Sequence, residues 1–471
     1  MDKKREYLWL FCVSSLFLLL HTIYVLQVNA DVAYMDTLRY IVYYPSILKQ
    51  KMQAIHYWNQ GEHRGLFTQF ALWVNIRVFG MNILLANVLT GFVLSALALI
   101  LARQWFQVAP ESNWISLAIV IFIYLAVFAP HGFELHTLDL GLPEISRNLF
   151  YVILVIWLLD SCARNSNRYY AGALLVVACM VFLSYGRIYA FMVALLSIVL
   201  LPRIVKWERG LAHFTRKEIA VIGSLCVGAV IFISMSKLIP SSVGSNASFK
   251  FDPASAYRCF GYAVSSALIG VEAAQKLYIF PWLLNCCGWI VAFVTLAASI
   301  RYAREIDHGA PVLPLFMAVY GVMNSIAVSV ARGSAGIDAV MASRYYPDMS
   351  LLIVGVVWML ASLATCKPTG EGSLVGRRVW WGALSLVFVL WGLGYVATTM
   401  VEARAVPYRT LAFNEMRAIT LSCSPLTKAD ADKLQTNSLA IAESAVRYQR
   451  ELRLGPWRTS AKTCDLVTEK P

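Results

Sequence analysis

The stretch Leu8–Val28, LWLFCVSSLFLLLHTIYVLQV, is a continuous apolar run close to the start of the chain. A helix needs about 20 predominantly apolar residues to cross the core of a bilayer. The basic segment MDKKREY precedes the run, as in a signal peptide, but the run is long for the apolar core of one. Val28-Asn29-Ala30 is also a poor cleavage site. We therefore expect Leu8–Val28 to be a retained transmembrane helix.

Comparable apolar runs continue along the whole chain, which is 59% hydrophobic and only 14% charged, with a mean hydropathy of +0.62. These values exclude an ordinary soluble protein. About eleven runs are long enough to be candidate spans: residues 8–28, 83–103, 114–131, 147–162, 169–184, 188–204, 218–238, 278–300, 311–330, 348–366 and 378–398. The predicted fold is an all-α, polytopic membrane helical bundle.

The distribution of Lys and Arg predicts the orientation of this bundle. Cytoplasmic loops are rich in these residues, and the alternate loops that begin with the N-terminus hold most of them, whereas the short connections near 131–147 and 185–188 hold one each. We expect a cytoplasmic N-terminus, a periplasmic C-terminus and a bacterial inner membrane. The net charge of +13 then reflects topology and contact with membrane lipid, and requires no nucleic acid.

Two parts are expected: a transmembrane domain, 1–398, which includes a first periplasmic loop, 29–82, and a periplasmic tail, 399–471. Local patterns predict amphipathic helices in the loop and a single helix in the tail, over 37–57, 64–79 and 427–452. Asp252-Pro253 is a typical helix start.

Cysteine and histidine positions bear on redox state and on metals. Cys423 and Cys464 both fall in the predicted tail, where an oxidising periplasm favours a disulfide between them; the alternative is two unpaired thiols. The segment 131–139 holds two histidines and two acids, but Glu-x-His is a poor spacing for metal ligands on a helix. We expect no divalent metal and no cofactor.

The first periplasmic loop begins DVAYMD, and it places Asp31 and Asp36 just beyond the first helix. Acids near a bilayer are costly to bury and tend to mark function. One of these residues could act as a catalytic base, and the alternative is that both are solvated loop acids. Further on, Glu62-His63-Arg64 could bind a sugar hydroxyl and a phosphate, or could simply cap a helix.

A later outer segment, ARGSAGIDAVMASRYYPD, holds Arg332, Arg344 and Tyr345. A guanidinium held at a membrane surface suits a lipid phosphate or pyrophosphate. The alternative is interfacial anchoring by Arg and Tyr. Arg187, in a tight outer turn, could likewise contact an anion or snorkel at a helix end.

The layout resembles that of the GT-C superfamily of polytopic glycosyltransferases. The resemblance rests on Met35-Asp36, on the element WNQGEHR at 58–64, on Arg332-Gly333 with Ser343-Arg344-Tyr345, and on the tail IAESAVRYQRELRLGPWR. It covers most of the chain in layout but only a small part by motif. The aspartates stand five positions apart, whereas relatives commonly have adjacent ones. Serotype-converting glucosyltransferases that modify bacterial O-antigen share this size and topology.

The resemblance implies transfer of one hexose from a polyprenyl-phosphate donor to a lipid-linked glycan acceptor at the periplasmic face. It assigns the base to Asp36, with Asp31 as the alternative. Arg344 becomes the main phosphate ligand, supported by Arg64, Arg332 and Tyr345, while Glu62 and His63 orient the acceptor. A flippase or transporter of lipid-linked glycans and an O-antigen polymerase are the alternatives, and a partner flippase that supplies the donor is left open.

Overall fold

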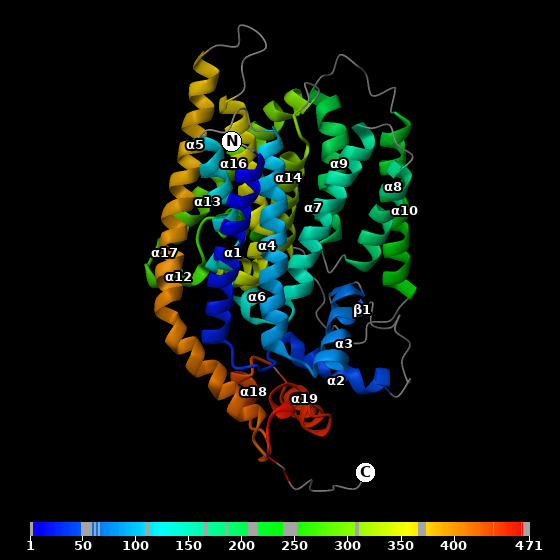
Figure 1. Ribbon diagram of the computed structural model, residues 1–471, viewed down its shortest axis with the longest axis vertical. Coiled ribbons are helices and arrows are strands. Elements are labelled where there is room, and N and C mark those ends of the chain that lie inside the picture. The colour runs from blue at the N-terminus through cyan, green and yellow to red at the C-terminus, as the bar shows by residue number, and fades with distance from the viewer. Residues whose placement is uncertain are drawn as a thin grey trace.

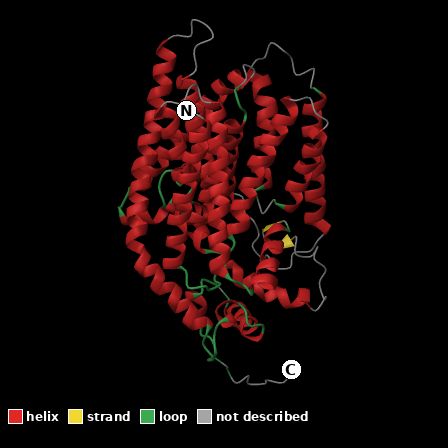
Figure 2. Cartoon of the chain, viewed as in Figure 1, coloured by secondary structure: helices red, strands yellow, loops and turns green. Residues whose placement is uncertain are grey.

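The computed structural model of the protein describes residues 3–48, 59–60, 63–64, 66–108, 114–163, 168–183, 187–205, 215–238, 252–306, 310–365, 374–436, 438–462 and 464. Figure 2 shows that the described chain is helical apart from loops and one pair of very short strands.

The elements of the first half are α1 (Lys3–Val28), α2 (Asp36–Leu48), β1 (Asn59–Gln60), β2 (His63–Arg64), α3 (Phe67–Phe79), α4 (Ile83–Val108), α5 (Trp114–Val127), η2 (Pro130–Gly132), α6 (Phe133–Thr137), α7 (Gly141–Ala163), α8 (Arg168–Phe182), α9 (Ile188–Val205) and α10 (Arg216–Leu238). Those of the second half are α11 (Pro253–Ser265), α12 (Val271–Lys276), α13 (Pro281–Ile306), α14 (Leu313–Arg332), η4 (Gly333–Ala335), α15 (Ile337–Val340), η5 (Ser343–Tyr345), α16 (Tyr346–Thr365), α17 (Leu374–Thr420), α18 (Lys428–Lys433), α19 (Leu439–Glu451) and η6 (Gly455–Arg458).

The long helices form one bundle, in which 10 helices of the described chain are long and apolar enough to cross a membrane. This is the arrangement of a multi-pass membrane protein. The one expected span that is not among these ten, 169–184, corresponds to α8, whose apolar part, Gly172–Phe182, is shorter. The start of α1 lies at one end of the bundle, and α18 and α19 lie at the other (Figure 1). We call the latter the tail end; it also carries α2, α3 and α6 (Figure 1).

Helix α16 is the centre of the bundle, because it contacts α5, α7, α13, α14 and α17 and is buried along nearly its whole length. Small residues allow the closest contacts between helices, as is usual in membranes. A Cβ atom on Gly321 would lie 2.3 Å from Cβ of Leu352 in α16. One on Gly288 of α13 would lie 1.8 Å from the carbonyl oxygen of Gly261 in α11.

Helix α17 continues without a break past residue 399, the expected start of the tail, to Thr420. Its 47 residues make it about 70 Å long at 1.5 Å per residue, which exceeds the ~30 Å hydrocarbon core. Figure 1 shows it running along one side of the bundle and continuing to the tail end. The last apolar helix of the bundle therefore continues directly into the tail.

The tail contains two helices where the sequence pattern predicted one over 427–452. Thr427 and Asp430 form a capping box at the start of α18. The chain then reverses at Gln435, which has a positive φ of 57°, and Ser438 caps α19 by accepting a hydrogen bond from the Ile441 N–H. The positive φ of Gln435 thus ends the first helix, and the Ser438 cap begins the second.

The segment between the first two spans, 29–82, also departs from its predicted helices. Helix α2 begins at Asp36, and the expected continuation to 57 lies outside the described residues. The second helix begins at Phe67 instead of 64, because His63–Arg64 pair with Asn59–Gln60 in an antiparallel hairpin. It ends at Gly80, as predicted, in a left-handed cap with φ of 60°. The helix start predicted at Asp252-Pro253 is confirmed, with Asp252 accepting a hydrogen bond from the Ala254 N–H.

Candidate active site at the tail end of the bundle

Asp36 is the first residue of α2, and its carboxylate is half-buried at 36% exposure. The chain enters the helix through Met35, whose N–H donates to the carbonyl oxygen of Leu434 in the tail at 3.0 Å. Arg39, one turn along, lies 3.5 Å from the Asp36 carboxylate. A helix N-terminus favours a negative charge. Asp36 is thus held as an accessible carboxylate at the tail end.

Arg344 reaches the same region from a different part of the chain. It lies in η5, directly before α16, and its backbone N–H donates to Oε2 of Glu134 in α6 at 3.1 Å. Its guanidinium carbon is 5.6 Å from the ring centre of Tyr345. The carboxylates of Glu134 and Asp36 both interact electrostatically with this guanidinium. The Asp36 carboxylate and the Arg344 guanidinium therefore lie within electrostatic reach of each other at the tail end.

The carboxylate of Asp31 is bound by other parts of the protein. Its carboxylate accepts hydrogen bonds from the N–H groups of Ile83 and Leu84 at 2.8 and 3.3 Å, at the start of α4. Its other oxygen pairs with Arg458 of the tail at 3.0 Å. Because both oxygens bind groups of the protein, Asp31 ties α4 to the tail, and we do not retain it as a base.

Two further predicted ligand groups are located only in part. Glu62 lies outside the described residues, and His63 and Arg64 are described only as the backbone of β2. Their roles stay predictions. Arg332 is the last residue of α14 and is half-buried. The next residue, Gly333, packs against α11, where Cys259 Sγ lies 3.6 Å from its carbonyl oxygen.

A buried network of charges, which the sequence analysis did not assemble, lies beside Tyr345. Asp348 in the first turn of α16 accepts hydrogen bonds from Arg147 at 2.8 Å, from Arg187 at 2.9 Å and from the Tyr320 hydroxyl at 2.9 Å. Arg147 also pairs with Glu144 at 2.6 Å. Both Arg147 and Glu144 lie in α7, where an outer connection had been expected.

Arg187 therefore does not simply snorkel at a helix end. Burial alone would lower the pKa of Arg187, but the adjacent Asp348 carboxylate and the nearby Glu144 outweigh it and raise that pKa. The only sequence signal for the network was that Arg147 and Asp348 stand at the ends of predicted spans. That signal is shared by many residues which face the headgroups.

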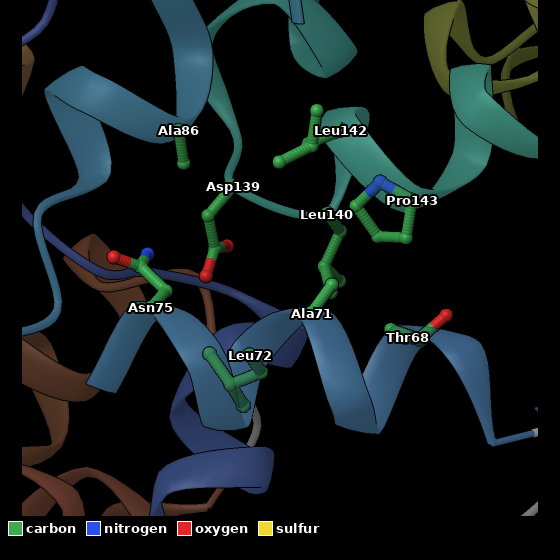
Figure 3. Close-up of a pocket in the computed structure, with 9 residues that line it drawn as sticks. All are labelled: Thr68, Ala71, Leu72, Asn75, Ala86, Asp139, Leu140, Leu142 and Pro143. Carbon is green, nitrogen blue, oxygen red and sulfur yellow. The ribbon is translucent and has the colours of Figure 1, made fainter. Parts of the chain in front are cut away.

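Asp139, in the connection between α6 and α7, lines a small pocket (Figure 3). Its carboxylate accepts a hydrogen bond from the hydroxyl of Thr37, the neighbour of Asp36. Burial raises the pKa of Asp139 to about 6. The other walls come from α3, α4, the same connection and the start of α7: Thr68, Ala71, Leu72, Asn75, Ala86, Leu140, Leu142 and Pro143.

The histidines of the 131–139 segment make contacts of other kinds. His131 Nε2 lies 3.0 Å from the carbonyl oxygen of Leu268, and its ring stacks on Tyr346 at 4.7 Å. His136 packs against the ring of His21. Within the described ranges, no group of three or more His, Cys, Asp or Glu is placed to hold a metal ion.

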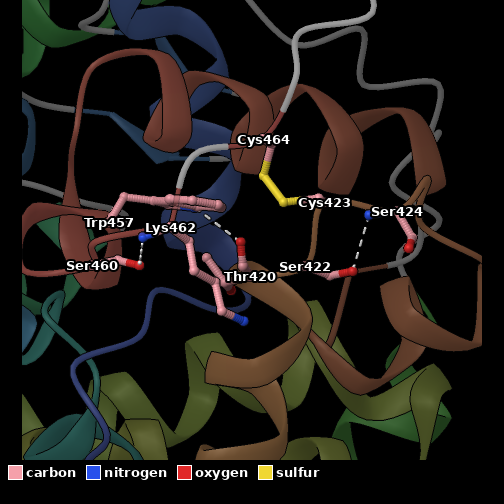
Figure 4. The surroundings of a disulfide bond; sticks show 8 residues. All are labelled: Thr420, Ser422, Cys423, Ser424, Trp457, Ser460, Lys462 and Cys464. Atoms are coloured by element: carbon pink, nitrogen blue, oxygen red, sulfur yellow. Dashed lines mark hydrogen bonds between the residues drawn. A yellow bond between two sulfur atoms is a disulfide. The ribbon is translucent and has the colours of Figure 1, made fainter.

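A disulfide joins Cys423 and Cys464 in the tail, with Cα atoms 5.4 Å apart (Figure 4). Next to it, the indole N–H of Trp457 donates to the carbonyl oxygen of Thr420, where α17 ends, at 2.9 Å. The tail is thus closed on itself and attached to the last transmembrane helix.

No protein-family model, curated protein or solved structure matches this chain. The function must therefore be argued from the geometry of its own residues.

Proposed function

We propose that this protein is a membrane glycosyltransferase of the GT-C type, with its site at the tail end of the bundle. It would move one hexose, such as glucose, from a polyprenyl-phosphate donor to a lipid-linked glycan such as O-antigen. The tail end would face the periplasm of a bacterial inner membrane. The observation that carries the proposal is that Arg344, whose N–H is bound by Glu134, carries a guanidinium within electrostatic reach of the Asp36 carboxylate, although the three residues come from distant parts of the chain.

The chemistry is a single displacement at the anomeric carbon of the donor. The acceptor hydroxyl oxygen forms the new bond to that carbon while its proton passes to the Asp36 carboxylate. The bond between the anomeric carbon and the phosphate oxygen breaks, and the phosphate leaves with the electron pair. Arg344 offsets the negative charge that develops on the leaving phosphate. The anomeric configuration is inverted.

The test uses Asp36→Asn and Arg344→Ala with a polyprenyl-phosphate hexose and extracted lipid-linked glycan, read by mass spectrometry. We expect each variant to lose at least about 100-fold in transfer rate, since each removes a group that acts in the transition state. Asp338→Asn and Arg258→Ala are matched controls, because both residues are exposed and neither belongs to the site. Variants that transfer as fast as the controls would show that the assigned site is wrong.

A carrier for lipid-linked glycans is the second candidate, and the charge network of Asp348, Arg147 and Arg187 favours it. Transporters use ionisable groups buried among their helices, and Arg147 and Asp348 lie inside helices that could span the membrane. The two functions separate in proteoliposomes. Movement of a labelled glycolipid between leaflets, without a change in its mass, supports the carrier; a mass increase of one hexose supports the transferase.

A further inference from the structure

Asp348 is a buried carboxylate with three partners from three other parts of the chain. Its Oδ1 accepts from Arg147 and Tyr320, and its Oδ2 accepts from Nε of Arg187. The residue is only 1% exposed. Taking a carboxylate out of water is expensive, and it is tolerated when cations and hydroxyl donors surround the charge. Arg147, which is 2% exposed, is itself balanced by Glu144.

Arg187 connects this network to the candidate site. Its guanidinium carbon lies 5.5 Å from the ring centre of Tyr345, and that of Arg344 lies 5.6 Å from the same ring centre. Arg187 and Arg344 therefore both approach the ring of Tyr345, which is itself a favourable contact for a cation. Two guanidinium groups beside the same ring are suited to bind the oxygens of one phosphate.

Asp348 determines the orientation of one of these two groups. A guanidinium is a rigid plane, so anchoring Nε of Arg187 on Asp348 at 2.9 Å restricts the direction of the whole group. A ligand that binds a preset guanidinium loses less side-chain entropy than one that must order it. The compensating pair of Arg147 and Glu144 keeps the network neutral.

We propose that Asp348 is a positioning residue for a lipid-phosphate site formed by Arg187 and Arg344 beside Tyr345. Asp348 does not touch the ligand; it acts by holding Arg187. The inference rests on the proposed function, in which the phosphate belongs to the polyprenyl donor. It adds Arg187 to the ligands and assigns a task to the buried network.

The experiment measures binding of a polyprenyl phosphate without any sugar to the purified full-length protein in nanodiscs. We expect Asp348→Asn and Arg187→Gln to weaken binding about tenfold or more, because hydrogen bonds to charged groups are the strong ones. Asp348→Glu should restore part of the affinity. Tyr320→Phe removes a hydroxyl that is shared by Asp348 and Asn148, but no charge. It should weaken binding by a smaller factor, and it provides the test if Asp348→Asn fails to fold.

Glu218→Gln is the matched control, since it breaks another partly buried Arg–carboxylate pair, with Arg203, between α9 and α10. It should leave lipid binding unchanged. Thermal unfolding of every variant separates loss of the site from loss of the fold. Neutral polyprenol, inorganic phosphate and phosphatidylglycerol vesicles, used as competitors, distinguish a polyprenyl phosphate from a free anion or an ordinary headgroup.

The proposal is overturned if wild type binds polyprenol as well as polyprenyl phosphate, or if folded Asp348 and Arg187 variants bind like wild type. Failure of the transferase function gives a different result. If wild type binds polyprenyl phosphate through this network yet transfers no hexose, the phosphate site stands and the transferase does not. If wild type transfers hexose and Asp348→Asn leaves the donor KM unchanged, the transferase stands and the positioning role falls.

Discussion

Single side chains at the tail end differ according to what surrounds them. Asp36 and Asp31 stand five positions apart in the sequence, and both looked like candidate bases. Asp36 keeps a half-exposed carboxylate, whereas Asp31 is used by the start of α4 and by Arg458. The sequence could supply both candidates but could not rank them by their partners, because those partners come from distant parts of the chain.

Asp139 gives a prediction about pH at this scale. Its pKa is about 6 in the fold, against ~3.9 for an unperturbed aspartate, so the folded state binds its proton more tightly. Stability from this group is therefore present at low pH and is lost as pH rises from about 4 to above 6. Asp139→Asn should raise the thermal midpoint at pH 7.5 and change it little at pH 4.5. The corresponding gain in the free energy of unfolding has an upper limit of about 3 kcal/mol.

The measurement is thermal unfolding of the purified protein at both pH values. Asp430→Asn is a control of opposite sign. The hydrogen bonds from Thr427 lower the pKa of Asp430, so this variant should destabilise the tail at pH 7.5. A midpoint for Asp139→Asn that shifts equally at both pH values would show that the ionisation of Asp139 does not contribute.

At the scale of elements, span positions were predictable because a bilayer requires a long apolar run. The ends of the helices were harder to predict from the sequence. The apolar run at 378–398 stops well before α17 does, since a helix beyond the membrane needs no apolar residues. The tail helix predicted as one became two, because a local turn at Gln435 competes with helical hydrogen bonds.

The contact between α11 and α13 gives the prediction for this scale. A Cβ at Gly288 would fall 1.8 Å from the Gly261 oxygen, so Gly288→Ala must push the two helices apart. We expect a loss of about 1–3 kcal/mol, measured as a lower thermal midpoint. Gly223→Ala is the matched control, since nothing lies within 4 Å of its Cβ, and it should be neutral or slightly stabilising. Equal midpoints for the two variants would contradict this packing.

At the scale of the whole molecule, the tail packs against the segments that carry the candidate site and holds them in place. Helix α19 packs against α2, Leu434 binds the Met35 N–H, and the Gly455 N–H donates to the carbonyl oxygen of Gly80 at 2.9 Å. The disulfide closes this tail over a sequence separation of 41. In the chain-entropy view such a bond stabilises by about 4 kcal/mol.

Cys464→Ser, or reduction, should therefore loosen the tail while leaving the bundle intact. We expect faster amide hydrogen exchange in α18, in α19 and around Met35, with unchanged exchange in α16. Transfer activity should fall when the tail loosens, because Met35, which the tail holds, directly precedes Asp36. Cys226→Ser, which changes an exposed free cysteine, is the control. Unchanged exchange in α19 after reduction would mean that the disulfide does not hold the tail in place.

Membrane class, the positions of the spans, the cap at Asp252 and the end of α3 near residue 79 all followed from local patterns. They depend on the length of apolar runs and on hydrogen bonds between residues a few positions apart. The neutral network around Asp348 and the capping of α4 by Asp31 did not follow from any pattern. An ionisable residue at the end of a span looks the same in sequence whether it faces headgroups or a carboxylate on another helix. The choice is made by helix packing, which brings distant residues together and sets whether each charge is solvated or paired.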